Sequence, residues 1–155
     1  MSQPEYPVEE GIISLPYRWA LGPVNARFFE AFKQKHIFGT RCPNCTRVLV
    51  PARKFCPQCF VDTTEWVEVK DEGTVRTWAL ISYAYFAQPK NPPYITAVID
   101  LDGADVGLSH YIGGVDFSDL EKIKGQVKIG MRVRAVWKDQ REGRITDIEY
   151  FTPAG

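Results

Sequence analysis

The sequence predicts a mainly β protein with one helix near its N-terminus and two small modules, a cysteine-rich ribbon followed by a five-stranded barrel. Two observations predict this fold. Four cysteines form two Cys-x-x-Cys pairs near the middle of the chain, and the chain has no other cysteine. From residue 64 onwards, short segments alternate apolar and polar residues between turn-forming residues, a pattern typical of antiparallel strands.

Residues 1–25 contain Pro, Gly and Glu without a sustained hydrophobic period, so we expect an extended arm. The arm is too apolar for a free tail, which predicts that it lies on its own domain or on a partner. Its apolar residues include Ile12, Ile13, Leu15, Tyr17, Trp19 and Leu21. Asn25 can cap a helix, and Phe28, Phe29 and Phe32 follow at helical spacing, which predicts a helix over about 26–35 that ends before Gly39.

The cysteine pairs predict a metal site. Two Cys-x-x-Cys turns ten residues apart direct four thiolates at one centre, and zinc prefers such a tetrahedral sulfur site. We therefore expect a structural Zn²⁺ in a rubredoxin-like zinc ribbon, within a module of residues 26–62. Its ligands would be Cys42, Cys45, Cys56 and Cys59. Iron accepts the same geometry and stays open as an alternative, although rubredoxins space the pairs further apart. A disulfide pairing is disfavoured because no signal-peptide pattern opens the chain.

Residues 63–155 are expected to form the barrel. We predict strands over 47–50 in the ribbon and then over 64–69, 74–86, 94–101, 106–112, 131–137 and 145–151, with a short helix over 116–124. Within 74–86, Val75, Thr77, Ala79 and Ile81 should share one face, and Arg76, Trp78, Leu80 and Ser82 the other. About five of these strands, with a helix before the last two, match a small Greek-key barrel of the OB type.

Charge is unevenly distributed although the chain is neutral overall. Between Ala26 and Phe60 there are seven basic residues and one acidic residue, so this segment carries +6 and the rest of the chain −6. A small metal module exposes its charges by default, and a solvated surface is the simplest explanation. The functional explanation is a patch for phosphates or an acidic partner. No apolar run approaches the roughly 20 residues that span a bilayer, so we expect a cytoplasmic protein without membrane contact.

Residues for catalysis are scarce. With all four thiols bound to metal, no cysteine nucleophile remains, and we expect no catalytic residue. His36 and His110 could serve as a base, but a lone histidine is more often structural. Asp100, Asp102 and Asp105 crowd one turn, but their spacing fits no EF-hand loop.

Binding of single-stranded nucleic acid is an alternative, because OB barrels stack bases on aromatic side chains in a positive groove. Aromatic residues are available, but this half of the chain is acidic. Only Arg76, Arg132 and Arg134 could line a groove on it.

The order of motifs resembles a family of zinc-ribbon plus OB-fold proteins associated with acyl-CoA metabolism, long known as a domain of unknown function. The resemblance runs from about Asn25 to Phe151. It rests on the helix Phe28-Phe29-Glu30-Ala31-Phe32, on Arg41-Cys42-Pro43-Asn44-Cys45, on Pro51-Ala52-Arg53 before Cys56-Pro57-Gln58-Cys59, and on Trp66 and Gly73-Thr74-Val75 at the barrel entry. The apolar arm lies outside the usual pattern of that family.

This resemblance implies a noncatalytic accessory subunit. Such chains pair with thiolases, related ketoacyl-CoA synthases, or hydratase- and aldolase-like enzymes, which implies a hetero-oligomer with a thiolase-fold subunit, for example α2β2. One branch accompanies thiolases that act on aromatic acyl-CoAs such as benzoylsuccinyl-CoA in anaerobic toluene degradation. Candidates for contact with CoA phosphates or with the partner are Arg41, Arg47, Arg53 and Lys54. An acyl-CoA hydrolase- or hydratase-like enzyme that uses His110 or a barrel carboxylate is the alternative.

Overall fold

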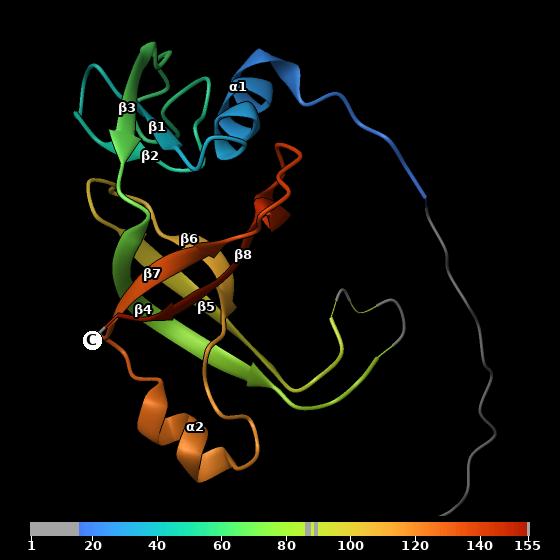
Figure 1. The fold of residues 1–155 in the computed structure, drawn as a ribbon. Helices are drawn as coiled ribbons and strands as arrows, with labels where there is room; N and C mark the ends of the chain where they lie inside the picture. The colour runs from blue at the N-terminus through green and yellow to red at the C-terminus, as the bar shows by residue number, and fades with distance from the viewer. Residues whose placement is uncertain (1–15, 86–87, 89, 155) are drawn as a thin grey trace, which may run out of the picture.

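The computed structural model describes residues 16–85, 88 and 90–154 (Figure 1). Two sheets form the fold: a three-stranded sheet in the order β2-β1-β3, and a closed barrel in the order β4-β5-β6-β8-β7. The elements are α1 (Gly22–Phe32), β1 (Ile37–Arg41), β2 (Val48–Leu49), β3 (Glu65–Val69), β4 (Glu72–Ile81), β5 (Tyr94–Leu101), β6 (Leu108–Ile112), α2 (Leu120–Gln126), β7 (Arg132–Trp137), the 3-10 helix η1 (Ile145–Asp147) and β8 (Ile148–Pro153). Figure 1 shows the small sheet and α1 at one end of the barrel and α2 at the other. The predicted mainly β architecture is confirmed.

Helix α1 begins four residues before its predicted start, at Gly22. Pro23 is compatible with the first turn, where its missing N–H has no helical partner. Asn25 is therefore inside the helix and is not its cap. Phe28 and Phe32 are fully buried, and the Phe32 ring meets Trp137 edge to face at a centroid distance of 5.4 Å. The helix thereby packs onto the end of β7 in the barrel.

Strand β1 is absent from the sequence prediction, which treated Gly39 as the helix terminator. Gly39 lies in the middle of β1, the central strand of the small sheet. A Cβ atom there would lie 2.7 Å from Val48 Cγ1 and 2.9 Å from Leu49 O. Glycine is required because the neighbouring strand β2 lies too close for a Cβ atom at this position, not because a helix ends.

The predicted faces of the long strand are correct within residues 77–80 but wrong for Val75 and Arg76, which each lie on the opposite face from the predicted one. The register of β4 against β5 shifts between Val75 and Thr77, which marks a β-bulge. An extra residue reverses the side-chain alternation, so Trp78 and Leu80 pack on the core with Val75. Thr77 and Ala79 are exposed. The strand ends at Ile81, and Phe86, its predicted end, lies outside the described residues.

The remaining barrel elements follow the prediction with shifted ends. Strand β5 has the predicted bounds, and it pairs antiparallel with β6 as a hairpin. Helix α2 begins at Leu120, four residues late, because the side chain of Asp119 caps it by accepting a hydrogen bond from the Glu121 amide. The 3-10 turn η1 occupies 145–147, so β8 begins at Ile148. A parallel contact between β6 and β8 closes the barrel at Ile112 and Phe151.

Ribbon and barrel share one hydrophobic core. Phe28, Ile37 and Val48 belong to the same buried cluster as barrel residues such as Val75 and Phe151. Strand β3 leads into β4 after only two residues. The predicted division at residue 62 stays a prediction. Strand β3, which was expected in the barrel module, pairs with β1 in the small sheet. No helix of the described residues is long and apolar enough to cross a bilayer.

Candidate metal centre

The four cysteine thiols converge on one point. Their Sγ atoms all lie within 4.8 Å of one another, and those of Cys45 and Cys56 are 3.8 Å apart. A tetrahedral site with Zn–S bonds of about 2.3 Å requires sulfur–sulfur separations of about 3.8 Å. Cys42 and Cys56 are fully buried, and Cys45 and Cys59 are half-buried. These residues fit a structural Zn²⁺ with four thiolate ligands and no open coordination position.

The two cysteine turns repeat the same backbone at an interval of 14 residues. In the first, the Cys42 amide donates to Arg47 O at 2.9 Å and the Thr46 amide donates to Cys42 O at 3.0 Å. The second repeats both bonds, from the Cys56 amide to Val61 O and from the Phe60 amide to Cys56 O, each at 2.9 Å. Thr46 and Phe60 also share the left-handed conformation, with φ of 62° and 53°.

Neighbouring thiols affect each other's ionisation. The Cys59 amide N–H is the main cause that lowers the pKa of the Cys56 thiol to about 7. The Cys45 thiol, together with burial, raises the pKa of Cys59 to about 12. Four thiolates so close together repel one another, so a cation is needed to hold all four ionised.

The basic candidate residues all lie on the ribbon, but they differ in their surroundings. The Arg41 side chain is already paired within the chain: its Nε lies 3.1 Å from Glu65 Oε1, and its guanidinium donates to Thr46 O at 3.3 Å. Arg47, Arg53 and Lys54 make no ion pair with any other described residue. The Arg53 backbone is fixed by Thr40, whose hydroxyl donates to Arg53 O at 2.9 Å and accepts from the Arg53 amide at 3.0 Å. The side chains of Arg47, Arg53 and Lys54 thus carry charges that no described acidic residue neutralises, in the segment that holds the cysteines.

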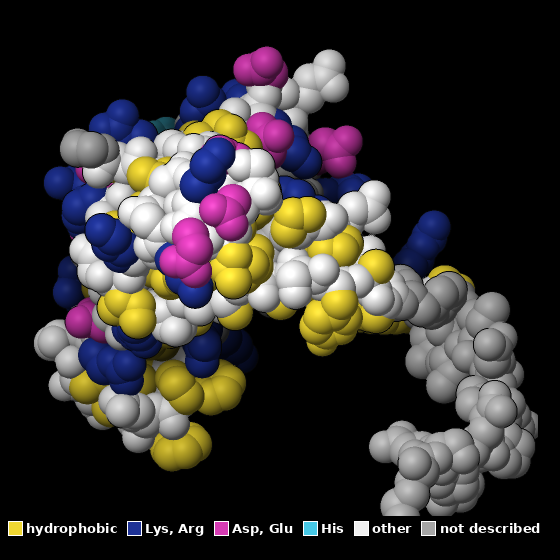
Figure 2. Space-filling model, turned by 90° about the horizontal axis from the view of Figure 1, so that it is seen from below, with side chains coloured by type: hydrophobic (Ala, Val, Ile, Leu, Met, Phe, Trp, Pro, Cys, Tyr) yellow, Lys and Arg dark blue, Asp and Glu magenta, His cyan; other side chains and the backbone are white. Residues whose placement is uncertain are grey.

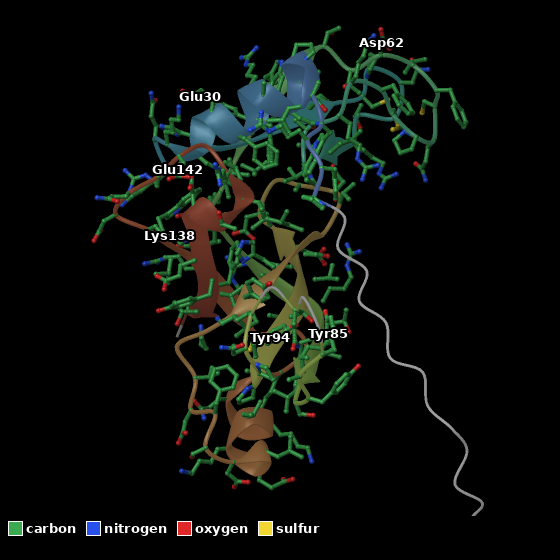
Figure 3. All side chains as sticks on the ribbon, turned by 90° about the vertical axis from the view of Figure 1, so that its right-hand side faces the viewer. Glu30, Asp62, Tyr85, Tyr94, Lys138 and Glu142 are labelled. Atoms are coloured by element: carbon green, nitrogen blue, oxygen red, sulfur yellow. The ribbon has the colours of Figure 1, made fainter. Side chains whose placement is uncertain are left out.

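Two phenylalanines of the ribbon were missed by the sequence analysis. Phe60 is 82% exposed and Phe55 is 52% exposed, and they flank the second cysteine pair. Phe55 forms an isolated β-bridge with Asp62, which Figure 3 labels at the outer end of the ribbon. Each of them is next to a cysteine of that pair, and no pattern in the sequence distinguishes an exposed aromatic residue there from a buried one.

Neither histidine is placed as a free base. His36 Nδ1 lies 2.5 Å from Glu68 Oε1 on the surface. The Nε2 atom of His110 donates to Ile145 O at 3.2 Å, and burial lowers the pKa of His110 below its ordinary value, so the ring is neutral near pH 7. His110 lines a cavity of about 540 Å³ on the barrel.

The arginines considered for a nucleic-acid groove are neutralised by acidic neighbours. Arg132 forms two hydrogen bonds of 2.7 Å with the Asp102 carboxylate. Arg134 Nε donates to Glu72 at 2.8 Å, and Arg76 Nε donates to Asp100 at 3.0 Å. On the end of the molecule shown in Figure 2, basic side chains are interspersed with acidic and apolar ones. This arrangement disfavours a basic groove for a single strand.

Comparison with known protein families finds two matches that follow one another along the chain. Residues 29–65 match the model of the ChsH2 rubredoxin-like zinc ribbon domain. Residues 66–138 match the model of the ChsH2 C-terminal OB-fold domain.

Two curated proteins are similar in sequence. A DUF35 domain-containing scaffold protein of Methanocaldococcus jannaschii is 31% identical over 134 residues, which cover 82% of this chain and 89% of the relative. A probable enoyl-CoA hydratase alpha subunit of Thermomonospora curvata is 27% identical over 124 residues. That match covers 77% of this chain and 35% of the relative, so the chain spans about a third of that protein.

Two solved structures have a similar fold. A DUF35-family protein of unknown function from Sulfolobus solfataricus has a TM-score of 0.58 at 31% identity, over 74% of this chain and 78% of that one. A chain of the Ltp2-ChsH2(DUF35) aldolase has a TM-score of 0.61 at 26% identity, over 88% of this chain and 98% of that one.

Proposed function

Because the chain belongs to the DUF35 family of zinc-ribbon and OB-fold scaffold proteins, we propose that it is a noncatalytic accessory subunit of a thiolase-type complex that processes acyl-CoA thioesters. The similarity to a chain of the Ltp2-ChsH2(DUF35) aldolase over 98% of that chain supports a role as the partner of a catalytic subunit. The similarity to an enoyl-CoA hydratase alpha subunit supports acyl-CoA chemistry in the complex.

The metal in this proposal is zinc in a structural role. The four converging thiols suit Zn²⁺, and a site with four protein ligands leaves no position for water or substrate. Since all four cysteines of the chain are in the site, the thiol nucleophile that thiolase chemistry needs must come from the partner.

The observation that carries the docking role is the exposure of Phe60. The left-handed φ of 53° at Phe60 belongs to the cysteine turn, which repeats it at Thr46 with a φ of 62°, so the turn sets the direction of the Phe60 side chain. The ring is 82% exposed, next to a cysteine that the metal would fix. Rigid aromatic side chains of this kind are enriched in the centres of protein interfaces. We propose that Phe60 and Phe55 contact the partner.

The finer assignments rest on the resemblance and on charge. The free cations Arg47, Arg53 and Lys54 suit the 3′-phosphate and diphosphate of CoA or acidic residues of the partner. Arg41, already paired with Glu65, is the weakest candidate. We further propose an α2β2 assembly and an aromatic acyl-CoA such as benzoylsuccinyl-CoA as the substrate of the complex.

The test is to purify the chain alone, the thiolase-type subunit alone, and the two after co-expression. We expect the two chains to co-elute and thiolysis to require the catalytic cysteine of the partner. Robust thiolysis by this chain in isolation would overturn the accessory role. If His110→Ala abolished turnover but left the assembly intact, catalysis would have to be assigned to the barrel instead.

A further inference from the structure

The barrel has a cavity that the accessory role does not use. Its volume is about 540 Å³, within the range of small-molecule sites. Strands β6 and β8 are in register only at Ile112 and Phe151, so they diverge towards the start of β6. There the side chain of His110 reaches across to Ile145 O, in place of a backbone ladder. The cavity lies where these two strands separate.

The cavity is placed where OB barrels accept ligands. Its walls come from β5 and β6, the second and third barrel strands, through Thr96, Ser109 and Tyr111. Lys90 reaches it from the β4–β5 connection, and Lys138 and Thr146 from the β7–β8 connection. The same two strands and two loops form the ligand-binding face of OB folds in general.

The walls combine an apolar surface with cations. Tyr111, Ile145 and Ile148 supply the apolar part, and Lys90 and Lys138 supply two ammonium groups against one carboxylate, that of Glu149. The Lys90 Nζ lies 5.3 Å from the centroid of the Tyr111 ring, so one charge stands directly beside the aromatic wall. Lys138, which Figure 3 labels, makes no side-chain hydrogen bond or ion pair with another described residue.

We propose that this cavity binds a small organic anion with a flat apolar body, of the aryl carboxylate class. The carboxylate would pair with Lys90 and Lys138, while the ring would pack on Tyr111 and the two isoleucines. A nucleic-acid strand would need several stacking rings along a row of free cations, whereas the cavity has one aromatic wall and two lysines. This site lies on the barrel, so the proposal does not depend on the docking of the ribbon.

The experiment uses the zinc-loaded full-length chain without any partner and follows its amide resonances by NMR. The probe is 2-naphthoate, and 2-naphthamide is the neutral control of the same shape. We expect saturable shifts at Ser109, Tyr111 and Thr146, and binding of the amide that is about tenfold weaker or more, because it lacks the charge. Equal affinity for the two probes, or no saturation at millimolar concentration, would overturn the proposal.

Variants separate the cavity from other surfaces. Lys138→Gln should weaken binding of 2-naphthoate several-fold, whereas Lys128→Gln, at an exposed lysine that does not line the cavity, should leave it unchanged. Thr146→Phe, at an exposed position of η1, should fill the cavity and abolish binding. Shifts centred on Phe55 and Phe60, unaffected by these variants, would assign the binding to the ribbon and contradict the proposal.

Discussion

Val48 of the ribbon and Asp105 of the barrel hairpin are joined by two reciprocal hydrogen bonds. The Val48 amide donates to Asp105 Oδ2 at 2.8 Å, and the Asp105 amide donates to Val48 O at 2.9 Å. Val48 is only 4% exposed, so its amide depends on this carboxylate. Of the three turn aspartates that could suggest a calcium site, Asp105 therefore connects the two modules, whereas Asp100 and Asp102 pair with barrel arginines.

Replacing Asp105 should loosen this connection. In Asp105→Ala the buried Val48 amide loses its acceptor, and we expect the free energy of unfolding to fall by about 1–3 kcal/mol. In Asp105→Asn, which keeps an oxygen acceptor, the free energy of unfolding should fall by less. Urea unfolding measures both, with Asp139→Ala as the control because the Asp139 side chain makes no hydrogen bond to another described residue. An Asp105→Ala variant as stable as the parent would mean that the amide finds another acceptor.

Loss of the metal should unfold the ribbon before the barrel. We expect one Zn²⁺ per chain by elemental analysis, and none bound stoichiometrically in Cys42→Ser, because a buried ligand is lost. The cysteines belong to a small cluster apart from the main core, so the amide resonances of β5 and β6 should persist when the metal is chelated. Arg47→Gln serves as a control that should retain zinc. Iron in the purified protein, with the absorption bands of a ferric tetrathiolate, would contradict the zinc assignment.

Phe60 should matter more for assembly than for folding. In Phe60→Gly the left-handed backbone costs nothing and no buried surface is lost, so we expect stability to change by less than about 1 kcal/mol. Affinity for the thiolase-type subunit should fall by at least tenfold, as measured by calorimetry, because an interface anchor is removed. Thr46→Gly, the equivalent change in the first cysteine turn, should spare assembly. If both variants assembled normally, the ribbon tip would not be the docking site.

Stability should decline in acid partly through Asp147. Burial alone would raise the pKa of Asp147, but the amides of Arg144, Glu142 and Gly143 donate to its carboxylate and lower the pKa below the ordinary value. This stabilisation is fully present above about pH 4, where the unfolded chain also has an ionised Asp147. It is lost as the pH falls through the lower pKa of the folded state, because the unfolded chain takes up the proton first.

The check is the pH dependence of urea unfolding between pH 2 and 7. In Asp147→Asn the free energy of unfolding should fall by about 2 kcal/mol at pH 7, and its further decline below about pH 4 should be shallower than in the parent. Asp139→Asn, on an exposed side chain, should follow the parent curve. Parallel curves for Asp147→Asn and the parent would show that other carboxylates cause the acid sensitivity.

The sequence was informative where local signals act alone. Strand β5 has its predicted bounds because alternating residues are bracketed by Pro93 and by the Asp102-Gly103 turn. The four cysteines were brought together correctly, since their spacing depends on local turns. Gly39 was misread because its reason, the closeness of Val48, exists only in the folded sheet.

Features without a local signature were missed. The bulge near Arg76 is set by the pairing of β4 with β5, and no residue type marks it. The exposure of Phe60 could not be inferred either, because an aromatic residue is buried by default. The 14-residue repeat of Cys-Pro-x-Cys was visible, but the shared conformation of Thr46 and Phe60 was not.

The repeated cysteine turn also bears on how a partner could orient the chain. Because the two turns have the same backbone and face one metal site, the backbone of the ribbon tip is nearly two-fold symmetric. A partner that contacted only this backbone could bind it in either of two orientations. One copy has threonine and the other phenylalanine at the same left-handed position. The two turns also differ at Arg41 and Phe55 and at Arg47 and Val61, so several side chains together distinguish the two directions. Exchanging only Thr46 and Phe60 would leave those other differences in place, so reversing the orientation of the bound chain would require all three pairs to be exchanged.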